Sequence, residues 1–278
     1  MTVAAVLLAA LLHASWNAIA KREPARVRLF AGMGLVAAAV GIAGALLVPA
    51  PAAPSVPWLS VSASFHVAYN AALLLAYRLG DFNQTYPLAR GIAPVIVAPV
   101  AVGVLGERLT ATATAGVAVI SVAMALLAIS PGMRGALPAL AAAALTGVAI
   151  AGYTLLDGIG VRRSGSPIGY AMWLMALEGG ASWLAVAAWH RLRRPPPTAH
   201  TRLWPLATVA GVLSVAAYTL VLWAQTRGAL AAVAALRESS VVIGAAIGAT
   251  VFGEALGRRR LLASGLVATG VVLIALPG

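Results

Sequence analysis

Apolar stretches of about 20 residues follow one another along the whole chain, separated by short polar segments. A helix of about 20 apolar residues crosses the hydrocarbon core of a bilayer. Only 9% of the 278 residues are charged, against roughly a quarter in a soluble domain. We expect ten spans, at residues 2–21, 27–49, 57–78, 82–105, 110–129, 136–158, 167–189, 203–226, 229–252 and 260–277. The sequence therefore predicts an all-α integral membrane protein with ten transmembrane helices and no soluble domain.

The net charge of +12 has a distribution typical of membrane loops. Its cations gather in short clusters between the expected spans: "KREPARVR", "VRRSG", "HRLRRPPPTAHTR" and "GRRRL". Such clusters lie beside anionic headgroups, whereas a nucleic-acid-binding surface would need a continuous basic stripe. The chain has no cysteine, which excludes disulfides and Cys-ligated zinc. Because polar residues interrupt the first span, we expect a retained helix there and not a cleaved signal peptide.

The chain contains an internal repeat, which is visible in two long segments. "AYNAALLLAYRLGDFNQTYPLARGIAPVIVAPVAVGVLGERL" resembles "AYTLVLWAQTRGALAAVAALRESSVVIGAAIGATVFGEAL". Tyr69 matches Tyr218, Arg90 matches Arg237, and a Gly-Glu pair follows each arginine at the same interval. This agreement predicts two copies of one structural unit.

Each copy would contain five helices, with the boundaries 1–130 and 135–278. Five is an odd number, so the second copy enters the membrane from the side opposite to the first. Such inverted repeats recur among secondary transporters, whose substrate site lies near the bilayer midplane between the two halves. The sequence therefore predicts two inverted five-helix repeats around a central site.

Several short motifs carry a resemblance to a known family. "LLHASWNAIAK", "YPLARGIAP" and "LGERL" in the first half, with "LRESSV" and "FGEAL" in the second, resemble the EamA branch of the drug/metabolite transporter superfamily. The resemblance covers essentially the whole chain. It implies ten helices around a central cavity and the movement of small metabolites or drugs, often outward. It also implies that both termini lie in the cytoplasm.

Two arginines lie inside expected spans, where an isolated charge costs about 2.5–3.5 kcal/mol on insertion scales. Arg90 and Arg237 are each about 6 Å from the centre of their span at 1.5 Å per residue, on opposite sides of the midplane. One interpretation is that they mark the two ends of a central site and contact the substrate. The other is that each is a structural strut that holds neighbouring carbonyl groups.

Aromatic and polar residues recur at corresponding places in several spans. The first and third spans share the pattern His-x-x-aromatic-Asn, whose spacing puts the three side chains on one helical face. Aromatic walls with a few polar groups are typical of small-molecule sites, although such groups also bond between helices. The candidate substrate-binding residues are His13, Trp16, Asn17, His66, Tyr69, Asn70, Arg90, Tyr153, Tyr218 and Arg237.

Acidic residues inside the spans are candidates for proton coupling or for ion pairs. Glu178 lies in the middle of the seventh span, Glu238 follows Arg237, and Asp157 lies near the end of the sixth span. Each could neutralise an arginine or carry protons, and we favour an ion pair. Glu107 and the matching glutamate of the second copy, at position 254, are expected to cap or bridge helix ends.

Proline and glycine distinguish the two halves. Pro87, Pro94 and Pro99 are expected to bend or loosen the fourth span, because each removes a backbone donor. The ninth span has no proline, and the spacing of Gly244 and Gly248 permits close helix packing there.

These observations favour a secondary transporter that exports a small polar or zwitterionic metabolite by alternating access. A channel and a structural membrane protein without transport activity are the alternatives. The chain lacks H-E-x-x-H, G-x-S-x-G and P-loop motifs, so we expect no enzyme activity, no catalytic residues, no metal and no cofactor. The expected partners are a small-molecule substrate and the lipid bilayer, with a second copy of the chain as a further candidate and no nucleic acid. The expected location is the bacterial cytoplasmic membrane.

The orientation of the chain is left open by the sequence. In a ten-span arrangement, the loops between spans 1–2, 3–4, 5–6, 7–8 and 9–10 hold most of the lysines and arginines. The positive-inside rule then places both termini outside. The family resemblance implies the opposite.

Overall fold

The structure is a computed structural model that describes residues 1–80, 82–128, 137–193, 203–253 and 257–276. These residues form helices joined by short connections, and no strand occurs among them. The all-helical prediction is confirmed. The helices are α1 Thr2–Arg22, α2 Arg26–Ala45, α3 Val56–Leu79, α4 Phe82–Gly103, α5 Ala111–Ala128, α6 Leu137–Arg163, α7 Pro167–Arg193, α8 Leu203–Gln225, α9 Leu230–Arg237, α10 Ser239–Phe252 and α11 Arg258–Ala275, with a short 3₁₀ turn at Ala53–Ser55 before α3.

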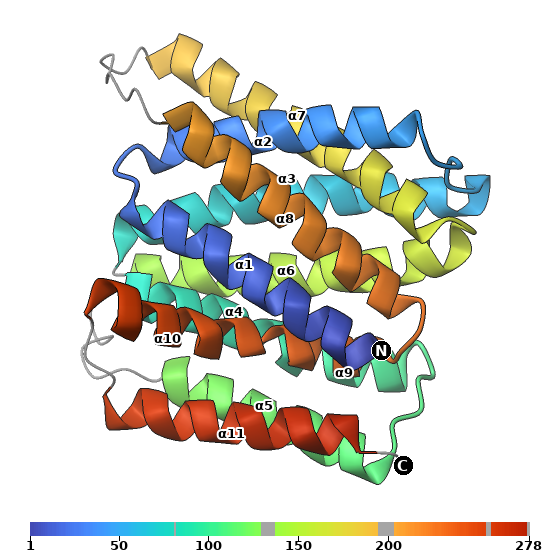
Figure 1. The fold of residues 1–278 in the computed structure, drawn as a ribbon, viewed down its shortest axis with the longest axis vertical. Coiled ribbons are helices and arrows are strands. Elements are labelled where there is room, and N and C mark those ends of the chain that lie inside the picture. The colour runs from blue at the N-terminus through green and yellow to red at the C-terminus, as the bar shows by residue number, and fades with distance from the viewer. Residues whose placement is uncertain (81, 129–136, 194–202, 254–256, 277–278) are drawn as a thin grey trace.

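The helices run back and forth between two ends of the molecule (Figure 1). They are stacked from α2 and α7 at one edge to α5 and α11 at the other. Both termini lie at the same end. Alanine, leucine and valine dominate these segments, and in a bilayer a helix satisfies all of its own backbone hydrogen bonds.

Seven helical segments are long and apolar enough to cross a membrane: Thr2–Arg22, Arg26–Ala45, Ala53–Leu79, Leu137–Arg163, Pro167–Trp189, Leu203–Gln225 and Leu230–Val251. The prediction of a membrane protein with several passes is therefore confirmed. Two of the other expected spans coincide with shorter apolar helices, Leu88–Gly103 and Ala111–Leu127. The last coincides with α11, which begins with three consecutive arginines. The count of ten spans stays a prediction.

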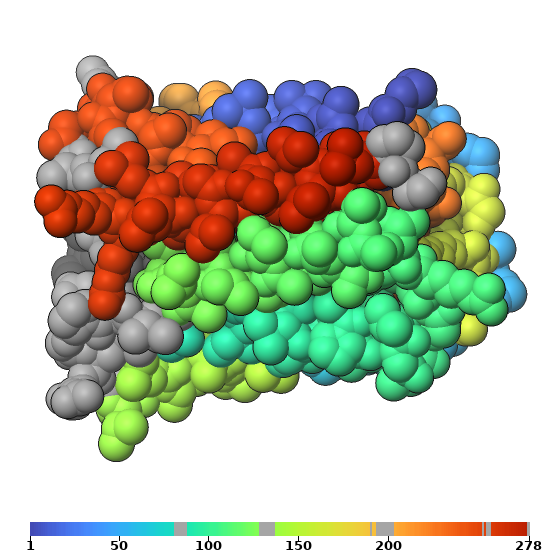
Figure 2. Space-filling view, turned by 90° about the horizontal axis from the view of Figure 1, so that it is seen from below, coloured from blue at the N-terminus to red at the C-terminus, as the bar shows by residue number. Residues whose placement is uncertain are grey.

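In two helix pairs, glycine lies directly against glycine. Where α2 meets α7, a Cβ atom added to Gly34 would lie 2.9 Å from the carbonyl oxygen of Gly179. Where α5 meets α11, a Cβ atom on Gly116 would lie 2.7 Å from the carbonyl oxygen of Gly270. Figure 2 shows α5 and α11 side by side on one face. Both contacts bring backbone against backbone, which only glycine permits.

The close packing that the G-x-x-x-G spacing permits does not occur at Gly244. A Cβ atom on Gly244 would meet no other atom of the described residues within 4 Å. The G-x-x-x-G spacing permits close approach but does not require it, and the neighbouring helices approach α10 elsewhere.

The expected ninth span is interrupted, whereas the fourth is not. The helical assignment of α4 continues through its prolines, but α9 ends at Arg237 and α10 begins at Ser239. Side chains satisfy the carbonyl groups at the interruption: the Ser239 hydroxyl donates to the Leu236 carbonyl oxygen at 2.7 Å, and Arg90 donates to that of Arg237 at 3.3 Å. Because these carbonyl groups keep partners, a helix can break here without leaving buried backbone unpaired.

Glu107 caps the start of α9, as its position in the repeat predicted. Its carboxylate accepts hydrogen bonds from the backbone N–H groups of Leu230 at 2.9 Å and Ala231 at 3.4 Å. The same carboxylate pairs with Arg162 at 2.7 Å, and the Arg162 side chain also donates to the carbonyl oxygen of Gln225. Negative charge at a helix N-terminus is stabilising. The matching glutamate at position 254 lies outside the described residues.

Candidate functional site

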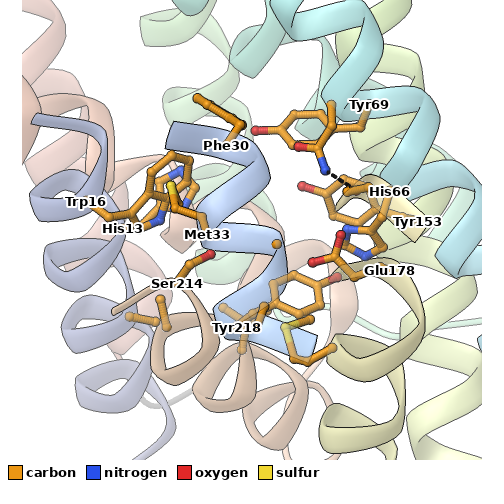
Figure 3. Close-up of a pocket in the computed structure, with 18 of the residues that line it drawn as sticks. His13, Trp16, Phe30, Met33, His66, Tyr69, Tyr153, Glu178, Ser214 and Tyr218 are labelled. Atoms are coloured by element: carbon orange, nitrogen blue, oxygen red, sulfur yellow. Dashed lines mark hydrogen bonds between the residues drawn. The ribbon is translucent and has the colours of Figure 1, made fainter. Parts of the chain in front are cut away.

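A cavity of about 100 Å³ lies in the centre of the bundle, between α1, α2, α3, α4, α6, α7, α8 and α9. Figure 3 shows His13 and Trp16 of α1 on one side of it, with His66, Tyr153 and Glu178 on the other. Its size fits a few water molecules, so a metabolite would need the helices to move apart. It is lined by Ala9, Ala10, His13, Trp16, Phe30, Met33, Gly34, Ala37, His66, Tyr69, Asn70, Arg90, Tyr153, Met175, Glu178, Ser182, Ser214, Ala217, Tyr218, Val221 and Arg237.

Most of the candidate residues from the sequence come together in this lining. Of the candidate substrate-binding residues, the exception is Asn17, whose amide donates to the carbonyl oxygen of His13 in its own helix at 2.9 Å. Glu178 also lines the cavity, whereas Glu238 lies behind Arg90. Those that line the cavity are His13, Trp16, His66, Tyr69, Asn70, Arg90, Tyr153, Tyr218 and Arg237.

Four rings form a continuous aromatic wall. The His66 ring stacks on Tyr153, with centroids 4.0 Å apart and planes at 17°. Tyr218 meets His66 edge-on at 5.1 Å, and Tyr69 meets Tyr153 edge-on at 5.7 Å. These rings come from α3, α6 and α8 and limit one another's movement. The wall offers a substrate both ring faces and hydroxyl groups.

A buried carboxylate lies behind this wall. Asp157 of α6 has no exposed surface, and its side chain joins helices on three sides. The His66 ring nitrogen Nε2 lies 3.1 Å from Oδ2, and the Tyr170 hydroxyl donates to Oδ1 at 3.1 Å. The Tyr218 hydroxyl also donates to Oδ2. The contacts of Asp157 are therefore with a histidine and two tyrosines, and His66 is within ion-pair distance of it.

Arg90 is held by several acceptors at the break between α9 and α10. Its Nε lies 3.2 Å from the Glu238 carboxylate, and both side chains are only 3% exposed. The same guanidinium donates to the Ser240 hydroxyl at 3.1 Å and to the Arg237 carbonyl oxygen. The ion pair expected for Glu238 is present and crosses between helices. These contacts match the interpretation of Arg90 as a strut.

Arg237 has different surroundings. Its guanidinium carbon lies 5.5 Å from the centre of the Tyr218 ring and 6.0 Å from that of Tyr153. Its polar contact is a distant one, to the Thr154 hydroxyl at 3.5 Å. Within the described ranges, no carboxylate lies within ion-pair distance of it. This cation is 7% exposed beside a cavity, and the rings of two tyrosines lie next to it.

Several polar groups in the lining lack a partner in the part of the chain that the structure describes. No described side chain or backbone group donates a hydrogen bond to Glu178. The ring nitrogens Nε2 of His13 and Nε1 of Trp16 are buried without a hydrogen-bond partner. Buried polar groups usually have partners, so these atoms identify positions where water or a substrate would bind. Among the described residues, His, Cys, Asp and Glu side chains form no group of three that could hold a metal ion.

Other residues of the site carry no clear signal in the sequence. Phe30, Ser182 and Ser214 line the cavity but look like ordinary membrane-helix residues. Tyr170 meets Asp157 from a different helix, and only the three-dimensional fold brings them together. The spacing of Tyr153 and Asp157 does link the aromatic wall to the buried carboxylate in the sequence. Residues four positions apart lie on one helical face.

The fold is shared with solved structures. Twenty-seven chains of known structure match this one. One of them, from a crystal structure of a protein, has 19% sequence identity and a TM-score of 0.75, and the match covers 98% of this chain and 95% of that chain. At this identity the likeness shows the fold alone. A search of curated proteins gives no match.

A comparison with protein families gives a match to the EamA-like transporter family over residues 137–276. The match covers the second half of the chain, from α6 to α11. It agrees with the resemblance carried by the sequence motifs, and with a bundle of apolar helices around a polar cavity. The chain belongs to the EamA-like transporter family, a family of membrane transporters of the drug/metabolite type.

Proposed function

We propose that this protein is a secondary transporter that exports a small zwitterionic metabolite, similar to an amino acid, by alternating access. The observation that carries the proposal is the presence of two ionisable side chains on one cavity, Arg237 and Glu178, neither of which forms an ion pair with another described residue. A zwitterion supplies the complement of each, a carboxylate for the guanidinium and an ammonium group for the glutamate. The aromatic wall would cover the apolar part of such a substrate.

We further propose that the chain crosses the bacterial cytoplasmic membrane ten times, as two inverted repeats covering 1–130 and 135–278. The helix contacts support this, because α3 packs on α6 as α8 packs on α1, while α2 packs on α7 and α5 on α11. The matching glycines of the two Gly-Glu pairs also share one backbone conformation, with φ of +68° at Gly106 and +66° at Gly253. A two-fold relation between halves gives a carrier two equivalent ways to open.

The direct test is counterflow in proteoliposomes that hold the purified protein. Vesicles loaded with a mixture of unlabelled amino acids are diluted into labelled ones, taken one at a time. A carrier gives transient, saturable accumulation of the label that the empty vesicles lack. Near-linear, non-saturable flux would identify a channel, and the absence of flux with every amino acid would contradict the proposed substrate class.

Arg237→Lys provides the site-specific arm of this test. Lysine keeps the charge but loses the planar fork that grips a carboxylate with two hydrogen bonds. We expect Arg237→Lys to lose most of the counterflow while the protein still inserts and folds. The matched control is Arg227→Lys, since Arg227 also lies over an aromatic ring, that of Trp223 at 4.5 Å, but does not line the cavity.

A further inference from the structure

The Asp157 cluster has a composition suited to binding a proton. Four side chains from four helices meet in it: His66 of α3, Asp157 of α6, Tyr170 of α7 and Tyr218 of α8. An ionised carboxylate without exposed surface is costly in a membrane unless it is paired or neutralised. No arginine or lysine is paired with Asp157 among the described residues, so the balancing positive charge can come from a proton on His66.

The pair of Asp157 and His66 therefore has two charge states. With one proton shared between the carboxylate and the imidazole, the pair is neutral overall, because it is either an ion pair or two uncharged groups. After that proton leaves, the pair carries one negative charge, which the hydroxyl groups of Tyr170 and Tyr218 stabilise by donating hydrogen bonds. The tyrosines make the deprotonated state tolerable, so both states are accessible.

The cluster also connects to the cavity. His66 and Tyr218 line it, whereas Asp157 and Tyr170 do not. The charged and titratable groups that line the same cavity are His13, Tyr69, Arg90, Tyr153, Glu178 and Arg237. Arg237 lies over the ring of Tyr218, whose hydroxyl contacts Asp157. Tyr218 therefore lies between the pair and Arg237, the residue that we assign to the substrate carboxylate. A change of charge on the pair would act on Arg237 across this one side chain.

We infer that the pair of Asp157 and His66 binds and releases the proton that couples transport to a pH gradient. The proton comes from water on one side of the membrane, resides on the pair, and returns to water on the other side. Tyr170 and Tyr218 are positioning residues that hold the carboxylate. This inference rests on the proposed transport function and adds its energy source.

The test separates exchange from gradient-driven movement in the same proteoliposomes, with an amino acid that the wild-type protein exchanges. Asp157→Asn removes the charge and keeps the shape. We expect it to retain counterflow but to lose pH-gradient-driven flux and the accompanying change of a pH-sensitive dye trapped in the vesicles. His66→Gln keeps a hydrogen-bonding group without a titrating ring but also removes a ring of the aromatic wall, so we expect its gradient-driven flux to fall more than its own counterflow. It serves where Asp157→Asn fails to fold.

The matched control is Glu23→Gln, another buried carboxylate, which accepts from the Ala25 N–H and lies outside the cluster. It should keep the gradient-driven component. Tyr170→Phe removes one hydrogen-bond donor from the carboxylate, and we expect it to weaken the gradient-driven component more than counterflow. Full gradient-driven flux in both Asp157→Asn and His66→Gln would overturn the inference. So would a wild-type protein that exchanges substrate but ignores the pH gradient.

A substrate-free measurement keeps the inference testable if none of the amino acids is exchanged. The chain has no cysteine, so Ser214→Cys in the cavity lining introduces a single reactive thiol. The rate at which a water-soluble maleimide labels this thiol is measured as a function of pH, once in Ser214→Cys alone and once in Ser214→Cys combined with Asp157→Asn. We expect the two pH profiles to differ. Identical pH profiles in the two backgrounds would contradict the proton site without bearing on whether the protein transports.

Discussion

Arg90 and Arg237 have the same side chain but not the same surroundings. Arg90 forms an ion pair with the Glu238 carboxylate and donates from Nη2 to a serine hydroxyl and a backbone carbonyl oxygen, so it is tied to the segment that joins α9 and α10. Arg237 lies over the rings of Tyr153 and Tyr218. An arginine whose donors are occupied stabilises structure, and one whose donors face a cavity can bind a ligand. Substitutions of Arg90 should therefore act mainly on stability, and substitutions of Arg237 mainly on transport.

Substitution of Arg90 should lower stability more than it lowers substrate affinity. Arg90→Ala leaves the Glu238 carboxylate buried without its partner, at a cost of about 3–5 kcal/mol. We expect a clear fall in melting temperature in detergent, with Arg90→Lys intermediate. Arg237→Lys, measured beside it, should keep its melting temperature. A stable Arg90→Ala protein with poor counterflow would mean that Arg90 contacts the substrate.

Much of the site could be predicted from residue spacing, and some of it could not. The spacing of three and four residues correctly put His13 and Trp16 on one helical face, as it did His66 and Tyr69. It failed for Asn17, because an amide at this spacing can also bond back to its own helix. Contacts such as that of Tyr170 with Asp157 depend on how distant helices meet, which no local pattern encodes.

The two arginines also show where an estimate along one helix is too simple. Counting residues put them on opposite sides of the midplane, yet the Arg90 guanidinium reaches the backbone of Arg237. An arginine side chain is long enough to span that difference in depth. Counting residues from the centre of a span therefore gives the depth of an arginine Cα atom, but not the depth of its guanidinium group.

At the scale of the helices, the break between α9 and α10 is a feature that the sequence did not predict. The prolines were expected to bend or loosen α4, which runs as one helix from Phe82 to Gly103, and the interruption follows Arg237 in a segment without proline. The "RESS" segment at 237–240 supplies hydrogen-bonding side chains at this point. The Ser239 hydroxyl donates to the Leu236 carbonyl oxygen, and the Ser240 hydroxyl accepts from Arg90. Serine near a helix end competes for backbone partners, which makes a break possible without proline.

The cap at the start of α9 offers a test of how firmly this broken helix is anchored. Glu107→Ala removes the acceptor for two backbone N–H groups and the partner of Arg162. We expect a loss of about 1–2 kcal/mol or more in stability, seen as a lower melting temperature. Thr110→Ala is the control, because Thr110 accepts from the Ala113 N–H at 3.1 Å in an exposed cap without an ion pair. Equal losses would mean that Arg162 adds nothing.

At the scale of the whole molecule, basic residues gather at the end opposite the termini. Lys21 and Arg22 close α1 and Arg258 opens α11 at that end, whereas Arg162 and Arg227 lie at the end that holds the termini. The positive-inside rule predicts that the more basic end faces the cytoplasm. The common description of the family predicts the reverse.

A reporter fused to the C-terminus decides between these orientations. We expect a fusion that is active only in the cytoplasm to remain inactive, because positive charge near span ends determines orientation. A fusion active only outside the cytoplasm should give the complementary signal. Activity of the cytoplasmic reporter would place both termini inside and would mean that the family orientation overrides the charge distribution.

The glycine contacts at the two edges of the stack have a mechanical consequence. At Gly34 with Gly179, and again at Gly116 with Gly270, helices of the two expected repeats approach each other backbone against backbone. Close contacts of this kind at the two opposite edges of the stack would permit one repeat to rotate against the other about a line that joins them (Figure 1). Such a hinge line would pass through the bundle, so a small rotation could widen the cavity toward one face while narrowing it toward the other.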